Sequence, residues 1–126
     1  MNYVIRKQVA RKIISFYHNV AKKYKHTYSE ELMHKNIDDA YNSVYLIENG
    51  LMRREPTISR WKKKELFMAT YFMKNRSRWN FAYRIDGDTV YVEDACHRQN
   101  MHEEMNAENR LREIIVEEIR KQICIL

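Results

Sequence analysis

The sequence has few of the residues that interrupt regular structure. Of its 126 residues, only two are glycine and one is proline, whereas 44% are hydrophobic. This composition leaves little room for disorder or linkers, and a chain of this length can bury roughly two thirds of its unfolded surface. We therefore expect one domain over residues 1–126, with a core over 1–102 and a C-terminal helix over about 103–124.

Cysteines and long apolar runs are also scarce. The two cysteines, Cys96 and Cys124, make no disulfide framework, which favours a reducing cytoplasm. No apolar run approaches the ~20 residues of a membrane-spanning helix, and residues 1–12 lack the apolar region of a signal peptide. We expect a cytoplasmic protein with no membrane partner, and the sequence leaves its oligomeric state open.

Positive charge is concentrated in the middle of the chain. The formal net charge is +6, and residues 53–84 hold ten basic but only two acidic residues. Residues 85–126 hold five basic and ten acidic residues. A concentrated positive segment suits a polyanion such as RNA or DNA, or an acidic protein. The alternative is that these basic residues form an ordinary solvated surface.

The first half of the sequence predicts a strand followed by two helices. Residues 3–7 form a short candidate strand, and apolar residues then recur at helical spacing over 10–24. Residues 27–30 have the spacing of a capping box, after which apolar residues step by three and four over 33–51. Residues 49–50, Asn-Gly, mark the end of this helix. Two helices joined by a short loop should lie antiparallel as a hairpin.

The second half predicts three strands and a last helix. Residues 65–74 are apolar on both faces and are expected to form a central strand. Residues 79–85 alternate between apolar and polar, Asp86-Gly87 provides a tight turn, and residues 90–95 return as the partner strand. Apolar residues over 111–123 form one stripe of a C-terminal helix.

The expected element order is therefore β, α, α, β, β, β, α. This order predicts an α+β domain in which an N-terminal helical hairpin packs on one face of an antiparallel β-sheet, with a C-terminal helix added. The last core strand ends in a polar, basic segment. Side chains at a strand end are held by the sheet yet reach solvent, so this end is the expected position of a site.

The order and two short stretches resemble the RelE/ParE superfamily of toxins from bacterial type II toxin–antitoxin systems. Residues 78–85 are similar to the aromatic-rich strand of that family, and residues 95–100 are similar to the His/Lys-Arg pair that ends its last core strand. The resemblance covers roughly residues 1–104. It implies a RelE-like fold, no cofactor, and a cognate antitoxin protein as partner.

The resemblance leaves two activities open. In the RelE branch the toxin is an mRNA endonuclease that acts on the ribosome, where the 2′-hydroxyl of the message attacks the adjacent phosphate without a metal. The alternative is a ParE-like or inactive relative that binds DNA gyrase, another protein or nucleic acid without cleavage. Asn80 stands where several ribonuclease members have an arginine, and Glu104 stands near the place of a late tyrosine, which departs from the cleaving branch.

Three residues near the strand end are the candidate catalytic groups. An unperturbed imidazole titrates near working pH, so His97 and His102 are candidates for an acid or base. Arg98, at the position of the family's terminal arginine, could stabilise a pentacoordinate phosphorane. Cys96 is expected to serve packing rather than nucleophilic attack, and the spacing of the nearby His and Cys residues fits no usual zinc pattern, so no metal is expected.

Basic and aromatic residues of the middle segment are the candidate nucleic-acid contacts. Arg78, Asn80 and Arg84 share one face of a strand, and the alternative to phosphate binding is a salt-bridged face paired with Glu93 or Asp94. Of the two tryptophans, Trp79 lies on the apolar alternation and is expected in the core, whereas the other lies among lysines and is expected to stack on bases. The full candidate set is Trp61, Lys62, Lys63, Lys64, Arg76, Arg78, Asn80 and Arg84.

Overall fold

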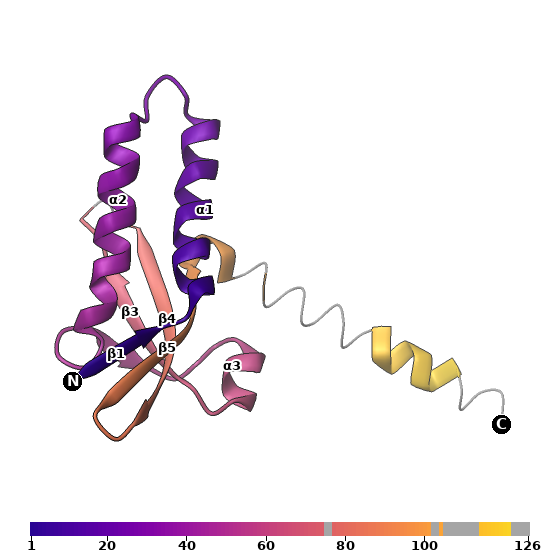
Figure 1. Ribbon diagram of the computed structural model, residues 1–126. Coiled ribbons are helices and arrows are strands. Elements are labelled where there is room, and N and C mark those ends of the chain that lie inside the picture. Colours follow the sequence, from indigo (N-terminus) through magenta and orange to yellow (C-terminus); the bar gives the residue numbers. More distant parts are fainter. Residues whose placement is uncertain (75–76, 102–103, 105–113, 122–126) are drawn as a thin grey trace.

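The computed structural model describes residues 1–74, 77–101, 104 and 114–121 of the chain (Figure 1). Five strands form one sheet, and the two longest helices stand together as a hairpin. The α+β class expected from the sequence is confirmed. The elements in chain order are β1 (Asn2–Ile5), α1 (Lys7–Lys23), α2 (Glu30–Asn42), the 3-10 helix η1 (Ser43–Leu46), β2 (Met52–Arg54), α3 (Ser59–Lys63), β3 (Phe67–Phe72), β4 (Arg78–Asp86) and β5 (Thr89–His97).

The sheet is mixed, which corrects the expectation of an antiparallel sheet. Its strand order is β1-β5-β4-β3-β2, and β1 runs parallel to β5 while the other neighbours are antiparallel. The element order also differs from the expected one, because β2 and α3 are added before β3. These two elements have three and five residues, which is too short for a hydrophobic period to show in the sequence.

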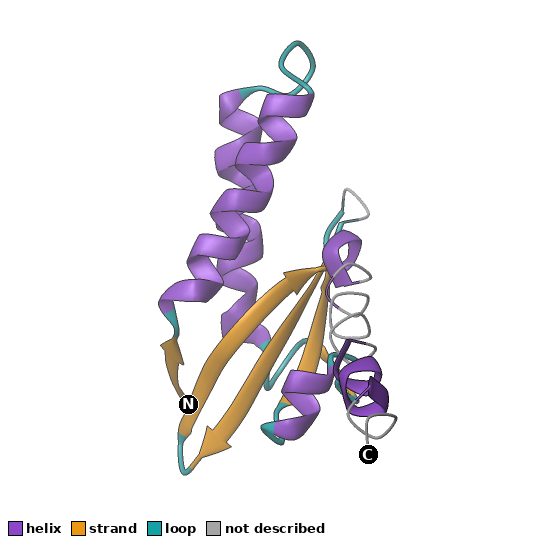
Figure 2. Cartoon of the chain, turned by 90° about the vertical axis from the view of Figure 1, so that its right-hand side faces the viewer, coloured by secondary structure: helices purple, strands orange, loops and turns teal. Residues whose placement is uncertain are grey.

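The helical hairpin covers one face of the sheet and forms the main core (Figure 2). Helix α1 is amphipathic and buries Val9, Ile13 and Tyr17. These side chains share one core with Trp79 and Phe81 of β4, which the alternation of that strand directs toward the helices. The predicted helical hairpin is therefore present, and the expected burial of Trp79 is confirmed at 1% exposure.

The cap of α2 lies within the segment that the sequence marked. Ser29 is the N-cap, and its hydroxyl oxygen accepts a hydrogen bond from the backbone N–H of Leu32 at 3.1 Å. The helix ends at Asn42, and η1 continues the chain to Leu46. The observed helix is therefore shorter than the apolar pattern over residues 33–51 predicts.

The opposite face of the sheet is covered only in part. Here Trp61 and its neighbours around α3 pack in a second, smaller core against Met68 and Ala82, which are paired across β3 and β4. Beyond this cover the same face carries Met52, which is 55% exposed, and Phe72, which is 44% exposed. We call this uncovered part, formed by β2, β3 and β4, the open face.

The β4–β5 hairpin contains the predicted tight turn and one irregularity. Gly87 has a φ of 59°, in the left-handed region that favours glycine, between strands that end at Asp86 and begin at Thr89. Farther along, Ala82 pairs with Asp94 and Tyr83 pairs with Val92, so Glu93 is an extra residue in β5. This bulge leaves Glu93 able to meet charged groups from two directions.

The C-terminal part of the chain is described only in pieces. Residues 98–101 continue from β5 as a helical turn, and residues 114–121 are helical and exposed. The rest of the helix expected over about 103–124 lies outside the described residues, apart from Glu104. Within the described part of the chain, no helix combines the length and the apolar character needed to cross a membrane.

Candidate nucleic-acid interface

An exposed aromatic ring lies between arginines on the open face. Phe72 and Arg78 are paired across β3 and β4, and the Arg78 guanidinium carbon lies 4.7 Å from the centroid of the Phe72 ring. The Arg54 guanidinium carbon lies 5.8 Å from the same centroid. These cation–π contacts orient both arginines. No carboxylate of a described residue forms an ion pair with either of them, so their positive charge remains available to a ligand.

Arg98 extends this group at the end of β5. His97 pairs with Trp79, so the next residue, Arg98, begins at the end of the sheet where Arg78 lies. Arg98 is exposed, and none of the carboxylates in the described ranges pairs with it. We call Arg54, Phe72, Arg78 and Arg98 the Arg–Phe row. It combines fork-shaped phosphate donors with a stacking surface, as interfaces for single-stranded nucleic acid do.

Asn80 supports this row from within the sheet. Its side chain is 8% exposed, and its Oδ1 accepts a hydrogen bond from the Thr70 hydroxyl at 2.7 Å. Thr70 itself is buried, so the pair forms a polar floor next to Arg78. This corrects the expectation that Asn80 is an exposed phosphate contact.

Arg84 shares the face of Arg78 but belongs to a different group. It lies at the other end of β4, where its Nε is 3.1 Å from Glu93 Oε1 and its guanidinium carbon is 3.9 Å from the centroid of the Tyr91 ring. The bulged Glu93 also binds Arg6, at 3.0 Å. The salt-bridged alternative is thus the observed arrangement for Arg84.

Trp61 is a core residue, which overturns its expected role in stacking on bases. It is 1% exposed, and its indole Nε1 donates a hydrogen bond to Asp94 Oδ2 at 3.0 Å. No ring face is therefore open to a base. The lysines that follow it, at positions 62, 63 and 64, are exposed as expected.

A basic groove adjoins the Arg–Phe row. It has a volume of about 630 Å³ and is lined by three basic residues, Arg53, Arg54 and Lys62, and by two acidic ones, Glu55 and Glu65, with Phe67 at its wall. The Arg53 guanidinium carbon lies 3.7 Å from the centroid of the Phe67 ring. Because Arg54 belongs to both, positive charge runs from the groove onto the open face. The arginines of β2 and Phe72 were not among the expected site residues.

His97 lies on the covered face of the sheet, among aromatic rings. It is 8% exposed, and its ring stacks on Phe16 with 3.9 Å between ring centroids and an interplanar angle of 17°. Its Nδ1 accepts a hydrogen bond from the backbone N–H of Gln99 at 3.0 Å. Nε2 must then carry the proton of the neutral ring and donate it to Ser77 Oγ. Burial lowers the pKa of His97 to about 4.

This arrangement does not suit His97 for general-base catalysis. The ring is neutral at neutral pH, and its single lone pair, on Nδ1, is already engaged by Gln99. The contact with Ser77 does not form a nucleophile–base pair either, because activation of a serine requires the opposite tautomer, with the lone pair on Nε2. His97 therefore holds the end of β5 against α1, contrary to the acid–base role expected from the sequence.

A cluster of four charges ties together α1, α3 and the end of β5. Asp94 Oδ1 lies 2.6 Å from Lys12 Nζ, and Asp94 Oδ2 lies 3.0 Å from Arg60 Nη2. Glu104 binds Arg60 and lies 3.8 Å from Lys12 Nζ. Burial alone would raise the pKa of Asp94, but the hydrogen bonds from Lys12, Trp61 and Arg60 outweigh it and lower that pKa. These contacts hold α3 against the sheet, over the second core.

The remaining candidates are divided between the core and the undescribed residues. Cys96 is 3% exposed, and burial raises the pKa of its thiol to about 12, which agrees with the expected packing role. Arg76 and His102 lie outside the described residues. Among the residues that the structure describes, no group of three His, Cys, Asp or Glu side chains could hold a metal ion.

The chain was compared with protein-family models, curated proteins and solved structures. No protein-family model matches the chain, and no curated protein or solved structure matches it. The fold and the site thus define an α+β domain with a mixed five-stranded sheet and a basic, aromatic surface on its open face.

Proposed function

We propose that the chain is a RelE/ParE-type toxin of a type II toxin–antitoxin pair, and that it binds RNA through the Arg–Phe row. One observation carries this proposal: the exposed Phe72 ring lies against Arg54 and Arg78, on a face where no described carboxylate neutralises them. Arginine binds phosphate with two parallel hydrogen bonds, and a base can stack on an exposed ring. Stacking and phosphate binding together suit an unpaired strand.

The arrangement of the elements supports the RelE-like part of the proposal. A strand leads into a helical hairpin that packs on the sheet, and an antiparallel β3-β4-β5 unit follows and ends in His97-Arg98. This strand end resembles the His/Lys-Arg pair that ends the last core strand of that family. A cytoplasmic location and a cognate antitoxin belong to the same proposal.

The proposed reaction is cleavage of mRNA on the ribosome. The 2′-hydroxyl attacks the adjacent phosphorus, the bond to the 5′-oxygen breaks, and the products are a 2′,3′-cyclic phosphate and a 5′-hydroxyl. Arg98 and Arg78 would stabilise the additional negative charge of the pentacoordinate phosphorane. The row supplies charge but, among the described residues, no available general base. Alignment of the message by the ribosome is therefore expected to supply much of the rate.

A second candidate is a ParE-like or inactive relative that binds DNA gyrase, another protein or nucleic acid without cleavage. Two observations favour it. The lone pair of His97 is engaged, and Asn80 stands where several ribonuclease members have an arginine. The basic row would serve binding in either case, so only the products of the reaction separate the two candidates.

The test combines growth with product analysis. Expression of the chain alone should arrest bacterial growth, and co-expression of its cognate antitoxin should restore it. The purified chain is then incubated with programmed ribosomes, in EDTA under conditions where the ribosomes are confirmed to be intact, and with matched messages that carry a 2′-hydroxyl or a 2′-deoxy group at the scissile nucleotide. Cleavage of the ribo message alone, with cyclic phosphate ends, supports the endonuclease. DNA breaks with intact mRNA support the gyrase alternative, and normal growth at high levels of folded protein contradicts the toxin.

A further inference from the structure

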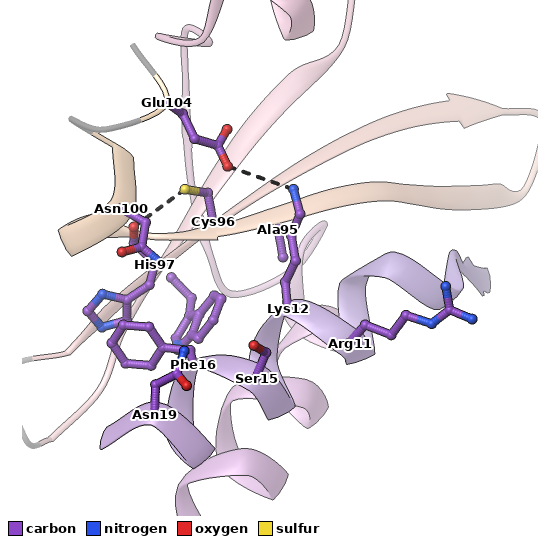
Figure 3. Close-up of a pocket in the computed structure, with 11 residues that line it drawn as sticks. Arg11, Lys12, Ser15, Phe16, Asn19, Ala95, Cys96, His97, Asn100 and Glu104 are labelled. Carbon is purple, nitrogen blue, oxygen red and sulfur yellow. Dashed lines mark hydrogen bonds and ion pairs between the residues drawn. The ribbon is translucent and has the colours of Figure 1, made fainter. Parts of the chain in front are cut away.

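A pocket of about 330 Å³ lies between α1 and the end of β5 (Figure 3). Ser15, Phe16 and Asn19 line it from α1, and Cys96 and His97 line it from β5. The pocket exists because β1 ends beside Val92, so no strand covers the last residues of β5 on that side. None of the residues that line it belongs to the Arg–Phe row.

The pocket carries uncharged polar groups that have no internal partner. Ser15, Asn19 and Asn100 all line it, and all three are exposed. Within the described part of the chain, none of their side chains makes a hydrogen bond. One hydroxyl and two amides offer both donors and acceptors. Such a set suits a ligand that presents donors and acceptors along one edge.

The charges at the pocket are balanced. Lys12 and Glu104 line one end, and they belong to the cluster with Asp94 and Arg60, which has two positive and two negative groups. The Cys96 thiol is protonated and the His97 ring is neutral at neutral pH. Apart from Arg11 at the rim, the charged side chains of the described residues that line the pocket are paired. The ligand that fits inside is therefore neutral and polar.

The wall and the rim of the pocket add two further requirements. Phe16, His97 and Trp79 form an aromatic wall, with the first two rings stacked and Trp79 edge-on to His97. Arg11 lines the pocket and extends from it toward solvent (Figure 3), and Arg98 directly follows the lining residue His97 in the chain. No described carboxylate pairs with Arg11 or Arg98. The site is thus aromatic inside and positively charged outside.

We infer that this pocket takes the base of a single nucleotide, while Arg11 and Arg98 at its rim hold the phosphate. A nucleobase is a neutral, planar heterocycle with donors and acceptors on its edge, and it carries its negative charge outside the ring, on the phosphate. Because Arg98 also belongs to the Arg–Phe row, the nucleotide would be one unit of the bound RNA, so the inference rests on the proposed RNA binding. A free mononucleotide has the same chemistry and is the other source.

The test compares RNA with and without bases. A labelled RNA octamer and an octamer of abasic ribose-phosphate units carry the same charges, and their affinities are measured by fluorescence anisotropy. Ser15→Phe places a ring in the pocket, and His18→Phe is the matched control, since His18 is exposed on the same helix outside the pocket lining. Binding of AMP and CMP is measured by titration calorimetry. Unchanged thermal melting confirms that both variants fold.

The expected result is a loss of about tenfold or more in octamer affinity for Ser15→Phe, with no change for the abasic octamer or for His18→Phe. If Arg78→Ala weakens octamer binding but Ser15→Phe does not, the pocket inference is wrong and RNA binding stands. If no octamer binds but AMP or CMP binds and is lost in Ser15→Phe, RNA binding is wrong and the pocket is a mononucleotide site. If Ser15→Phe binds both the octamer and the mononucleotides as tightly as the wild type does, the inference is wrong.

Discussion

Replacement of Asp94 by asparagine should destabilise the domain by about 1–4 kcal/mol at neutral pH. Asp94 Oδ1 accepts hydrogen bonds from Lys12 and from the backbone N–H of Ala95, and Oδ2 accepts from Arg60 and Trp61. In Asp94→Asn one oxygen becomes an NH₂ group that faces two donors. Whichever way the amide turns, one buried donor, the Trp61 indole or the Ala95 amide, loses its acceptor.

The magnitude follows from the burial of these donors. A buried donor without an acceptor costs about 1–3 kcal/mol. The Lys12 and Arg60 side chains are each 38% exposed, and both keep Glu104 as a neighbour, so the weakened ion pair adds only about 0–1 kcal/mol after solvent screening. For a domain of this size the sum corresponds to a decrease in Tm of roughly 10 °C.

The pH dependence gives a second measure of the same residue. The pKa of Asp94 is lowered in the folded state, so its contribution to stability is present above the unfolded value of 3.8 and is lost as the pH falls through the folded pKa. The difference between wild type and Asp94→Asn should therefore shrink in acid. Urea unfolding followed by circular dichroism, at neutral pH and near pH ~3, measures both quantities.

Asp86→Asn is the control, because Asp86 is exposed beside the hairpin turn and its replacement should cost no more than about 0.5 kcal/mol. If Asp94→Asn and Asp86→Asn have the same free energy of unfolding at neutral pH, the cluster does not stabilise the fold as described. A difference that grows in acid would contradict the assigned direction of the pKa shift.

Further predictions concern the row and the buried titratable groups. Arg78→Ala and Arg98→Ala should lower mRNA cleavage by about ten- to ten-thousand-fold in the ribosome assay, whereas Arg84→Ala, whose partner is Glu93, should leave it unchanged. Phe72→Leu should weaken RNA binding by roughly five- to 150-fold in the anisotropy assay with little change in Tm, because the ring is 44% exposed; equal affinity would remove stacking from the proposal. The His97 ring should titrate with a midpoint of about 4 in NMR spectra, and folding stability should fall as the pH drops from 6.5 toward that value, since the unfolded ring binds the proton first; a midpoint near 6.5 would show that the ring is solvated. In a Cys124→Ser variant, Cys96 should react with a thiol reagent only after unfolding, as followed by mass spectrometry, and rapid labelling of the native protein would contradict its burial.

The parts of the fold that the sequence predicts are those with long, regular patterns. Val9, Ile13 and Tyr17 repeat at helical spacing, and they are the residues that α1 buries. The alternation of β4 likewise directs Trp79 into the core. In both cases the period extends over several turns or residue pairs, so one misleading residue does not change the interpretation.

The errors arise where a distant partner decides the outcome. Trp61 is surrounded in the sequence by lysines, but its burial depends on Asp94, 33 residues away. His97 was expected to be open because it ends a strand, yet Phe16 from α1 covers its ring. The apolar pattern places Phe72 in a strand buried on both faces. The ring is nevertheless 44% exposed, because the five-residue helix α3 does not reach that end of the sheet. Local composition contains none of these long-range contacts.

The parallel pairing of β1 with β5 has a consequence for the order of folding during synthesis. Asn2 pairs with Thr89, so β1 is synthesised well before β5, the strand with which it pairs. The helical hairpin and the β3-β4-β5 meander depend on shorter separations and can form first. Until β5 leaves the ribosome, β1 lacks its strand partner, and closure of this sheet edge is the late, slow event.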